Sequence, residues 1–219
     1  MTAPLVRIPQ ADLNPQRLAL TAIKKPRMLP RIIKGLKADK APVKYGCAKA
    51  LRLISEQRPD RLYPSFEFFV GLLDHENRIL QWEAIFVLSQ LARADDDDKF
   101  ADVFDKYFSP IPGPVMITAA NVIQGGARIA QAKPNLADRI AAEILKVGRA
   151  RYQTAECRNV AIGHAIVALG AILPLLRHPA PAVTFVRRQT KNRRPATRKK
   201  AEHFLKSLPS SQVSGNRAS

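Results

Sequence analysis

Cysteine and histidine are scarce in this chain of 219 residues, which holds two cysteines and four histidines. Cys47 and Cys157 lie 110 positions apart, and no CxxC, CxxH or HExxH spacing occurs. So few and so distant thiols cannot form a disulfide framework, and the spacing of a zinc site is missing. Both cysteines stand beside alanines in apolar stretches, which predicts buried thiols and fits a reducing compartment. We therefore expect no metal and no other cofactor.

The chain also lacks the short motifs that many enzymes carry. It has no GxSxG nucleophile elbow, no GxGxxG turn and no GKS or GKT phosphate loop. The run Asp95–Asp98 lacks the alternating spacing and the glycine of a calcium loop. We interpret it as a linker, with Asp97 or Asp98 near the start of the next helix, where negative charge is favourable. These absences favour a protein without enzymatic activity.

Long apolar runs are missing as well, because no stretch of about 18 apolar residues occurs. The longest candidate, "NVAIGHAIVALGAILPLL", is interrupted by His164 and Pro174 and predicts a buried helix, with a partly buried imidazole favoured over a metal ligand. The first 25 residues contain three prolines and no continuous apolar segment of a secretory signal. We expect no membrane association and a cytoplasmic location. The basic, acid-free residues 16–37 leave an organellar transit peptide as an alternative.

What the chain has in excess is positive charge, with a formal net charge of +18. The charge is +10 over residues 1–58, −6 over 59–112, +4 over 113–158 and +10 over 159–219. A chain that is basic at both ends and acidic in the middle favours polyanions or acidic protein surfaces as partners. A surface that only keeps the protein in solution is the alternative.

One apolar pattern recurs along the chain. "VKYGCAKALRLISEQRPD" aligns with "LQWEAIFVLSQLARADDD" when Tyr45 is placed on Trp82, and further copies fit at steps of 35, 42 and 40 residues after a first step of 37. Apolar residues recur at three and four positions within each copy, which predicts a helix with one buried stripe. A small residue recurs at the same place of each copy: Cys47, Ala84, Ala119, Ala161 and Ala201.

A shorter amphipathic segment precedes each copy, and prolines and small polar residues separate them. Proline is tolerated in the first turn of a helix, where its missing N–H costs little. Repeats of this length correspond to two short helices and two turns. The pattern therefore predicts an all-α chain of about five helical hairpins, whose shorter helices cover residues 28–39, 62–74, 98–108, 136–148 and 181–190.

The segment "LLDHENRILQWEAIFVLSQLA" resembles a HEAT repeat, and the resemblance extends over roughly residues 17–207. It implies a right-handed α–α superhelix of about five HEAT-like hairpins over residues 16–207, with flexible tails at 1–15 and 208–219. Gly125–Gly126 is expected to weaken the third inner helix, and the long loop "GRARYQTAE" is expected to disturb a uniform superhelix. An irregular helical bundle remains the alternative.

The inner helices of a HEAT array line a concave groove, which the resemblance makes the expected binding site. Lys44, Arg158 and Arg198 align with Gln81, and Arg52 and Lys206 align with Ser89. We predict a partner-binding groove formed by Lys44, Arg52, Gln81, Ser89, Arg158, Arg198 and Lys206. Its two ends would be basic and its centre neutral.

A second candidate surface is the segment "RRQTKNRRPATRKK" near the end of the repeats. Its basic cluster consists of Arg187, Arg188, Lys191, Arg193, Arg194, Lys199 and Lys200. Such a cluster suits phosphates, and the absence of interleaved aromatics argues against single-strand readout.

HEAT arrays serve as scaffolds, transport factors, enzyme subunits and nucleic-acid binders. The first hypothesis is that the protein is a non-enzymatic scaffold, which binds an acidic protein partner through the groove. The alternative is a nucleic-acid-binding protein that contacts phosphates through its basic terminal repeats. HEAT-like DNA glycosylases are disfavoured, because Trp82 aligns with Tyr45 as a packing residue. The sequence leaves the oligomeric state open.

Overall fold

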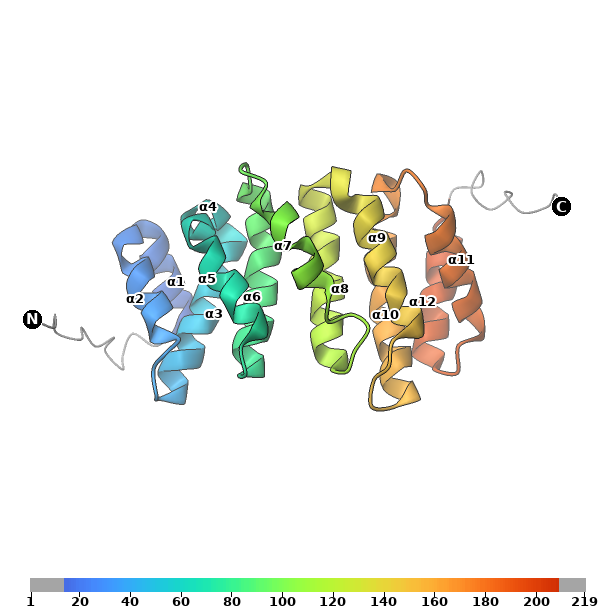
Figure 1. Ribbon diagram of the computed structural model, residues 1–219, viewed down its shortest axis with the longest axis horizontal. Coiled ribbons are helices and arrows are strands. Elements are labelled where there is room, and N and C mark those ends of the chain that lie inside the picture. The colour runs from blue at the N-terminus through green and yellow to red at the C-terminus, as the bar shows by residue number, and fades with distance from the viewer. Residues whose placement is uncertain (1–13, 209–219) are drawn as a thin grey trace, which may run out of the picture. The chain divides into compact units, whose positions relative to one another are not determined.

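The computed structural model describes residues 14–208, which form α-helices and short 3-10 helices and contain no strand (Figure 1). The predicted all-α class is therefore confirmed. The chain divides into two compact units, of which unit 1 ends at Val103 and unit 2 begins at Phe104. The sequence had predicted one repeat domain over 16–207. Helix α7 (Lys99–Phe108), which follows the acidic linker, runs across this boundary.

Unit 1 is a row of antiparallel helices. Helix α3 packs against α1 and α2 on one side and against α6 on the other, and α5 packs on α6 (Figure 1). The predicted pairs are thus α2 with α3, and the segment of α4 and α5 with α6. The helices are α1 (Pro15–Lys24), α2 (Leu29–Gly35), α3 (Ala41–Gln57), α4 (Pro59–Leu62), α5 (Phe66–Gly71) and α6 (Arg78–Leu91). Short 3-10 helices join them: η2 (Pro26–Met28), η3 (Tyr63–Ser65), η4 (Leu72–Asp74) and η5 (Ala92–Ala94).

Helix α1 is an element that the repeat pattern did not predict. The Asn14 side chain caps it by accepting a hydrogen bond from the Arg17 N–H, and its buried residues are Leu18, Ala19 and Ala22. The expected tail boundary at residue 15 is wrong by two positions, because Asn14 and Pro15 already form the start of this helix. Leu208 is also buried. The other residues of the two predicted tails, 1–13 and 209–219, lie outside the described residues.

Unit 2 repeats the same arrangement. Helix α10 packs between α8 and α12, while α9 packs against α8 and α10, and α11 packs against α12 and α9. Besides the second half of α7, the helices are α8 (Met116–Ala132), α9 (Ala137–Leu145), α10 (Ala155–Ile172), α11 (Ala180–Arg188) and α12 (Pro195–Lys206). The short 3-10 helices are η6 (Pro134–Leu136), η7 (Lys146–Arg149), η8 (Leu173–Leu175) and η9 (Gln189–Lys191).

The small residues of the five copies all lie inside the two units. Their exposed fractions are 0% or 1%, for Cys47, Ala84, Ala119, Ala161 and Ala201 alike. A small side chain lets the backbones of neighbouring helices approach closely, and the flanking leucines and isoleucines then bury the remaining surface. Burial raises the pKa of the Cys47 thiol to about 11, which keeps it protonated. Cys157, which was also expected to be buried, is only half-buried.

The double glycine does not weaken the third inner helix, so that expectation is wrong. Helix α8 runs without interruption from Met116 to Ala132, and both Gly125 and Gly126 are buried in it. A Cβ atom on Gly126 would lie 2.9 Å from the Phe108 ring and 3.3 Å from Ile140. The glycine therefore makes room for the aromatic side chain of α7 rather than breaking the helix.

The acidic run is a linker, and Asp98 directly precedes the first residue of α7, Lys99, as expected. Asp95, which the sequence did not single out, also contacts the start of this helix. Asp95 is buried, and its carboxylate accepts hydrogen bonds from the backbone N–H groups of Lys99 and Phe100 at 2.8 and 3.0 Å. It also accepts a hydrogen bond from the Tyr63 hydroxyl at 2.7 Å. Burial, with this carboxylate beside it, raises the pKa of Tyr63. Asp96, Asp97 and Asp98 are exposed, as a solvated linker requires.

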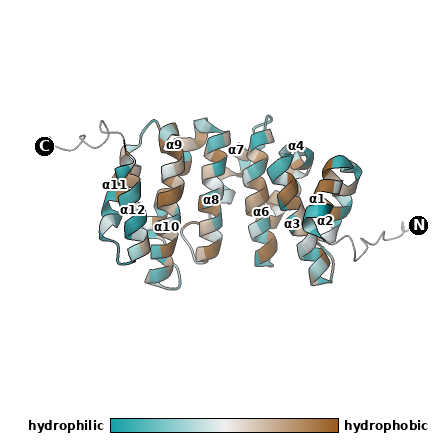
Figure 2. Cartoon of the chain, turned by 180° about the vertical axis from the view of Figure 1, so that it is seen from behind, coloured by the Kyte–Doolittle hydropathy of each residue, from teal (hydrophilic) through white to brown (hydrophobic). Residues whose placement is uncertain are grey.

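Helix α10 with its 3-10 extension, Ala155–Leu175, is long and apolar enough to cross a membrane by length and composition, and 44% of that window is buried within the described residues. The core helix of a globular repeat meets the same criterion. Brown predominates on α10 in Figure 2, whereas α12 is largely hydrophilic. The apolar character of α10 follows from its place between two other inner helices.

Two glycines in helices provide a matched test of the packing around α8. We expect the Gly126→Ala substitution to lower the free energy of unfolding by about 1 to 3 kcal/mol, because the new methyl group overlaps a buried ring. The Gly71→Ala substitution in α5 should leave stability unchanged or raise it by up to about 1 kcal/mol. Nothing lies within 4 Å of its added Cβ, and alanine favours the helix. Urea unfolding monitored by circular dichroism measures both; equal losses would contradict the packing described.

Candidate functional site

Two residues of the predicted groove, Gln81 and Ser89, are not available to a partner. Gln81 is 7% exposed, and its amide donates a hydrogen bond to the Leu73 carbonyl while accepting one from Arg78 at 3.1 Å. Ser89 is fully buried, and its hydroxyl donates to the Phe86 carbonyl at 2.7 Å. The prediction was wrong for both, because these polar side chains satisfy backbone groups inside unit 1.

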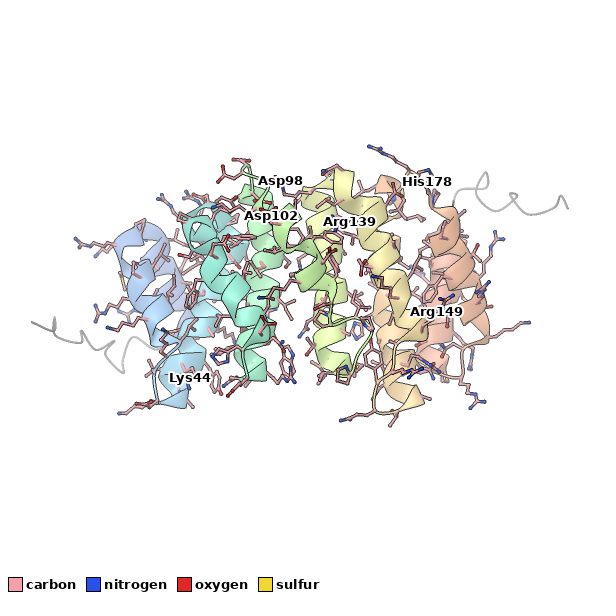
Figure 3. All side chains as sticks on the ribbon, in the orientation of Figure 1. Lys44, Asp98, Asp102, Arg139, Arg149 and His178 are labelled. Carbon is pink, nitrogen blue, oxygen red and sulfur yellow. The ribbon has the colours of Figure 1, made fainter. Side chains whose placement is uncertain are left out.

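The two cations that the prediction placed in unit 1 are half-buried. Lys44 stands in the first turn of α3, at the opposite end of unit 1 from Asp98 (Figure 3). The guanidinium of Arg52 stacks 3.6 Å above the Phe86 ring. It also lies 3.6 Å from the Glu56 carboxylate and 3.9 Å from that of Glu83. Carboxylates of its own unit therefore compensate the charge of Arg52.

Glu83 is the unusual carboxylate of this group. Its Oε2 atom is buried and has no hydrogen-bond partner among the described residues. Burial raises the pKa of Glu83, although the positive charges of Arg52 and Lys49 oppose the shift. Within residues 14–208, no group of three metal-ligating side chains comes together, here or elsewhere. Glu83 is therefore a proton-binding group without a reaction partner beside it.

The remaining groove residues, Arg158, Arg198 and Lys206, belong to unit 2. Arg158 and Lys206 are exposed. Arg198 is half-buried, and its guanidinium donates hydrogen bonds to the carbonyls of Asn192 and Arg193 at 2.9 and 3.1 Å. Arg198 thus fixes the turn that precedes its own helix rather than reaching outward.

The predicted basic cluster extends over the end of α11, the turn that follows it and the first half of α12. Its exposed members are Arg188, Lys191, Arg193 and Lys199, and its half-buried members are Arg187, Arg194 and Lys200. The Nε of Arg194 lies 2.7 Å from Oε1 of Glu156 in the first turn of α10. The hydroxyl of Thr197 donates to the Asn159 carbonyl at 2.8 Å. These contacts bring the α11–α12 turn beside the α9–α10 turn.

The neighbouring α9–α10 turn adds two cations that the sequence analysis missed, Arg149 and Arg151. Both are exposed, and Arg149 lies at the opposite end of unit 2 from Arg139 and His178 (Figure 3). A comparison of the fourth and fifth copies at their 40-residue step would have found Arg151, which then falls on Lys191, but not Arg149, which falls on Gln189. The basic turn edge of unit 2 consists of Arg149, Arg151, Arg158, Arg188, Lys191 and Arg193.

The backbone of the α9–α10 turn is well fixed. The Arg151 N–H donates to the Pro112 carbonyl at 2.8 Å, and the Tyr152 hydroxyl donates to the Ile111 carbonyl. Burial raises the pKa of Tyr152 to about 12, so this hydroxyl stays a donor. Thr154 caps α10 by accepting a hydrogen bond from the Cys157 N–H at 3.1 Å. The arginines of this turn therefore project from a rigid support.

The charges of the basic turn edge are uncompensated. Over residues 14–208, none of its six cations has a carboxylate within ion-pair distance. The nearby Glu156 pairs with Arg194, which is not one of the six. Like charges at this density repel one another and create a positive potential over the two turns. An anionic ligand with several regularly placed charges is the partner that such an edge can hold.

Comparisons with known proteins bear on the fold alone. No family model matches the sequence, and no curated protein matches it. Among solved structures, the chain is similar to a crystal structure described as an engineered protein, with a TM-score of 0.55 and 16% sequence identity. The match covers 88% of this chain and 83% of that one. At such an identity the likeness supports the all-α fold and carries nothing about function.

The buried carboxylate in unit 1 makes the stability of the protein depend on pH. Because the folded state raises the pKa of Glu83, its stabilising effect is present below the ordinary glutamate pKa and is lost as pH rises through the folded value. The free energy of unfolding of the wild type, relative to Glu83→Gln, should therefore increase as pH falls from about 8 to about 4. Urea unfolding across this range measures the difference, with Glu67→Gln at an exposed carboxylate of α5 as the control. A difference that does not change with pH, or that changes equally in the control, would contradict it.

Proposed function

We propose that the protein is a HEAT-like helical-repeat protein, wound as a right-handed solenoid, that binds the phosphate backbone of double-stranded nucleic acid through the basic turn edge of unit 2. We assign it a binding role, without a reaction of its own, and a cytoplasmic location. The observation that carries the proposal is the uncompensated charge of two adjoining turns. The resemblance of "LLDHENRILQWEAIFVLSQLA" to a HEAT repeat supports the architecture.

The chemistry of the edge favours phosphate groups. Five of its six cations are arginines, whose planar guanidinium can donate two parallel hydrogen bonds to a phosphate. Each cation that neutralises a phosphate releases a condensed counterion, which makes binding favourable at low salt. Duplex DNA carries one negative charge per about 1.7 Å of its axis, a higher density than a single strand offers. The six exposed cations on two adjoining turns are suited to that density.

The aromatic residues near the edge do not offer a platform for unpaired bases. Tyr152 is half-buried with its hydroxyl bonded to the Ile111 carbonyl, and the Phe185 ring lies 3.1 Å from where a Cβ of Gly148 would be. Binding of single strands without sequence preference depends on exposed rings on which bases stack. The edge therefore favours contacts to the backbone of a duplex, with little dependence on base sequence.

An acidic protein partner is the second candidate, and two exposed apolar side chains favour it. Val167 on α10 is 56% exposed and Ile117 on α8 is 49% exposed. Protein interfaces combine an apolar centre with a charged rim, and the exposed cations Arg158 and Lys206 stand on the inner helices of the same unit. This candidate keeps the expected groove, now restricted to residues of unit 2.

A salt titration with matched variants tests the proposed function. We expect a fluorescein-labelled duplex of random sequence to bind the wild type, with an affinity that falls steeply as salt increases. The Arg188→Ala/Lys191→Ala/Arg193→Ala variant should bind at least on the order of tenfold more weakly and reduce the log–log salt slope by about 2 to 3. The control Lys24→Ala/Lys25→Ala/Arg27→Ala removes the same charge from exposed positions of unit 1 and should bind as the wild type does.

The outcomes separate the two candidates. Equal loss in both triple variants would show that total charge, rather than the basic turn edge, holds the duplex. No binding of DNA or RNA duplexes at low salt would remove the nucleic-acid proposal. An acidic peptide that then binds, and is weakened by Val167→Ser, would establish the protein partner instead.

A further inference from the structure

The inner helices α8, α10 and α12 of unit 2 each contribute one polar side chain around Gly163 and His164. His164 of α10 is half-buried, and its Nδ1 lies 3.3 Å from Nε2 of Gln124 on α8. His164 is six residues from Arg158, which corresponds to about 9 Å along the helix axis. His164 therefore lies less than two helical turns from Arg158 along α10.

The third side chain, Lys200, comes from α12 on the other side of α10. A Cβ atom on Gly163 would lie 3.5 Å from the Lys200 Nζ and 3.1 Å from the Thr197 hydroxyl. The glycine thus allows α12 to approach α10 closely, and the ammonium group lies against α10 at the residue before His164. Gln124, His164 and Lys200 come from three successive inner helices.

This group faces almost no negative charge. Helix α8 contains no acidic residue, the only carboxylate of α10 is the Glu156 that pairs with Arg194, and α12 has only the exposed Glu202. Burial lowers the pKa of His164, and the positive charges of Lys200 and Arg194 lower it further. At neutral pH the free protein therefore holds a neutral imidazole next to an ammonium group that has no carboxylate partner.

We propose that Gln124, His164 and Lys200 form a phosphate subsite on the inner helices of unit 2, filled by a backbone phosphate of the duplex held at the basic turn edge. The inference rests on the proposed function. The Lys200 ammonium and the Gln124 amide donate to phosphate oxygens, and His164 becomes the third donor after it takes up a proton from the solvent. All three are donors in that state, as a phosphate requires.

The proton uptake gives the subsite a signature that a simple charged patch lacks. An anion beside His164 favours the imidazolium form, so the pKa of His164 is higher in the complex than in the free protein. Binding then tightens as pH falls through this range, by up to tenfold for each unit of difference. Gln124 from α8 contacts the His164 ring, and the charges that act on it are those of Lys200 from α12 and Arg194 from the turn before α12.

The test measures the affinity for a labelled DNA duplex at about pH 6 and about pH 8 at one ionic strength. We expect the wild type to bind about threefold to tenfold more tightly at the lower pH. The His164→Gln variant should lose most of that gain while it still binds at the higher pH. The His203→Gln variant removes an exposed histidine from α12 and should keep the gain.

A second pair of variants and a spectroscopic readout guard against a simple loss of packing. Lys200→Gln should reduce both the affinity and its pH dependence, whereas Lys206→Gln, on the same helix, should reduce at most the affinity. The imidazole resonances of His164 should titrate at higher pH in the complex than in the free protein. Full pH dependence in His164→Gln, or an unchanged His164 titration, would overturn the subsite and leave the edge intact. Failure of the wild type to bind a duplex at either pH would instead sink the proposed function.

Discussion

The close contact between neighbouring inner helices is the constraint on which both units depend. Ala84 in unit 1 and Ala119, Ala161 and Ala201 in unit 2 are almost completely buried, and their small side chains let the backbones approach closely. Gly163 extends the same principle to α10 and α12, where even a methyl group would lie 3.1 Å from the Thr197 hydroxyl. Because the helices lie close, their turns also lie close, and side chains from different hairpins are brought side by side.

The interactions that stabilise the α11–α12 hairpin do not involve its exposed cations. The ion pair between Arg194 and Glu156 is largely exposed, and such pairs contribute little, typically below about 1 kcal/mol. The hairpin is held instead by buried apolar side chains such as Val186 and Phe204. Apolar burial therefore offsets the repulsion among the exposed cations, which can then serve a ligand instead of the fold.

The sequence predicted most of the fold because one periodicity runs through it. The apolar stripe and the small residue located α3, α6, α8, α10 and α12, which the structure confirms. Helix α1 was not predicted, because it is a single helix with no second segment to which it could be aligned. Asp95 was passed over because four identical aspartates give no sequence reason to choose among them, whereas the Tyr63 hydroxyl, 32 positions away, makes Asp95 the buried one.

The candidate site was harder to predict than the fold. Aligning the repeats shows which residues occupy equivalent positions, but it does not show which of them are buried. Gln81 and Ser89 align with exposed cations of unit 2, yet both are buried and donate hydrogen bonds to nearby backbone carbonyls. Arg149 and Arg151 were missed because they lie in a turn, outside the helical periodicity. Only the folded structure places this turn beside the α11–α12 turn, whose cations belong to the same edge.

Helix α1 has a consequence for assembly. Stacked repeats with an uncovered apolar flank can add copies end to end and grow into filaments. On its side of α3, α1 covers the apolar flank with Leu18, Ala19 and Ala22, while Gln16, Arg17 and Lys24 face outward. Helix α1 thus covers that flank of α3, although its own Leu20 is 53% exposed, and a shortened chain without α1 would expose the apolar side of α3.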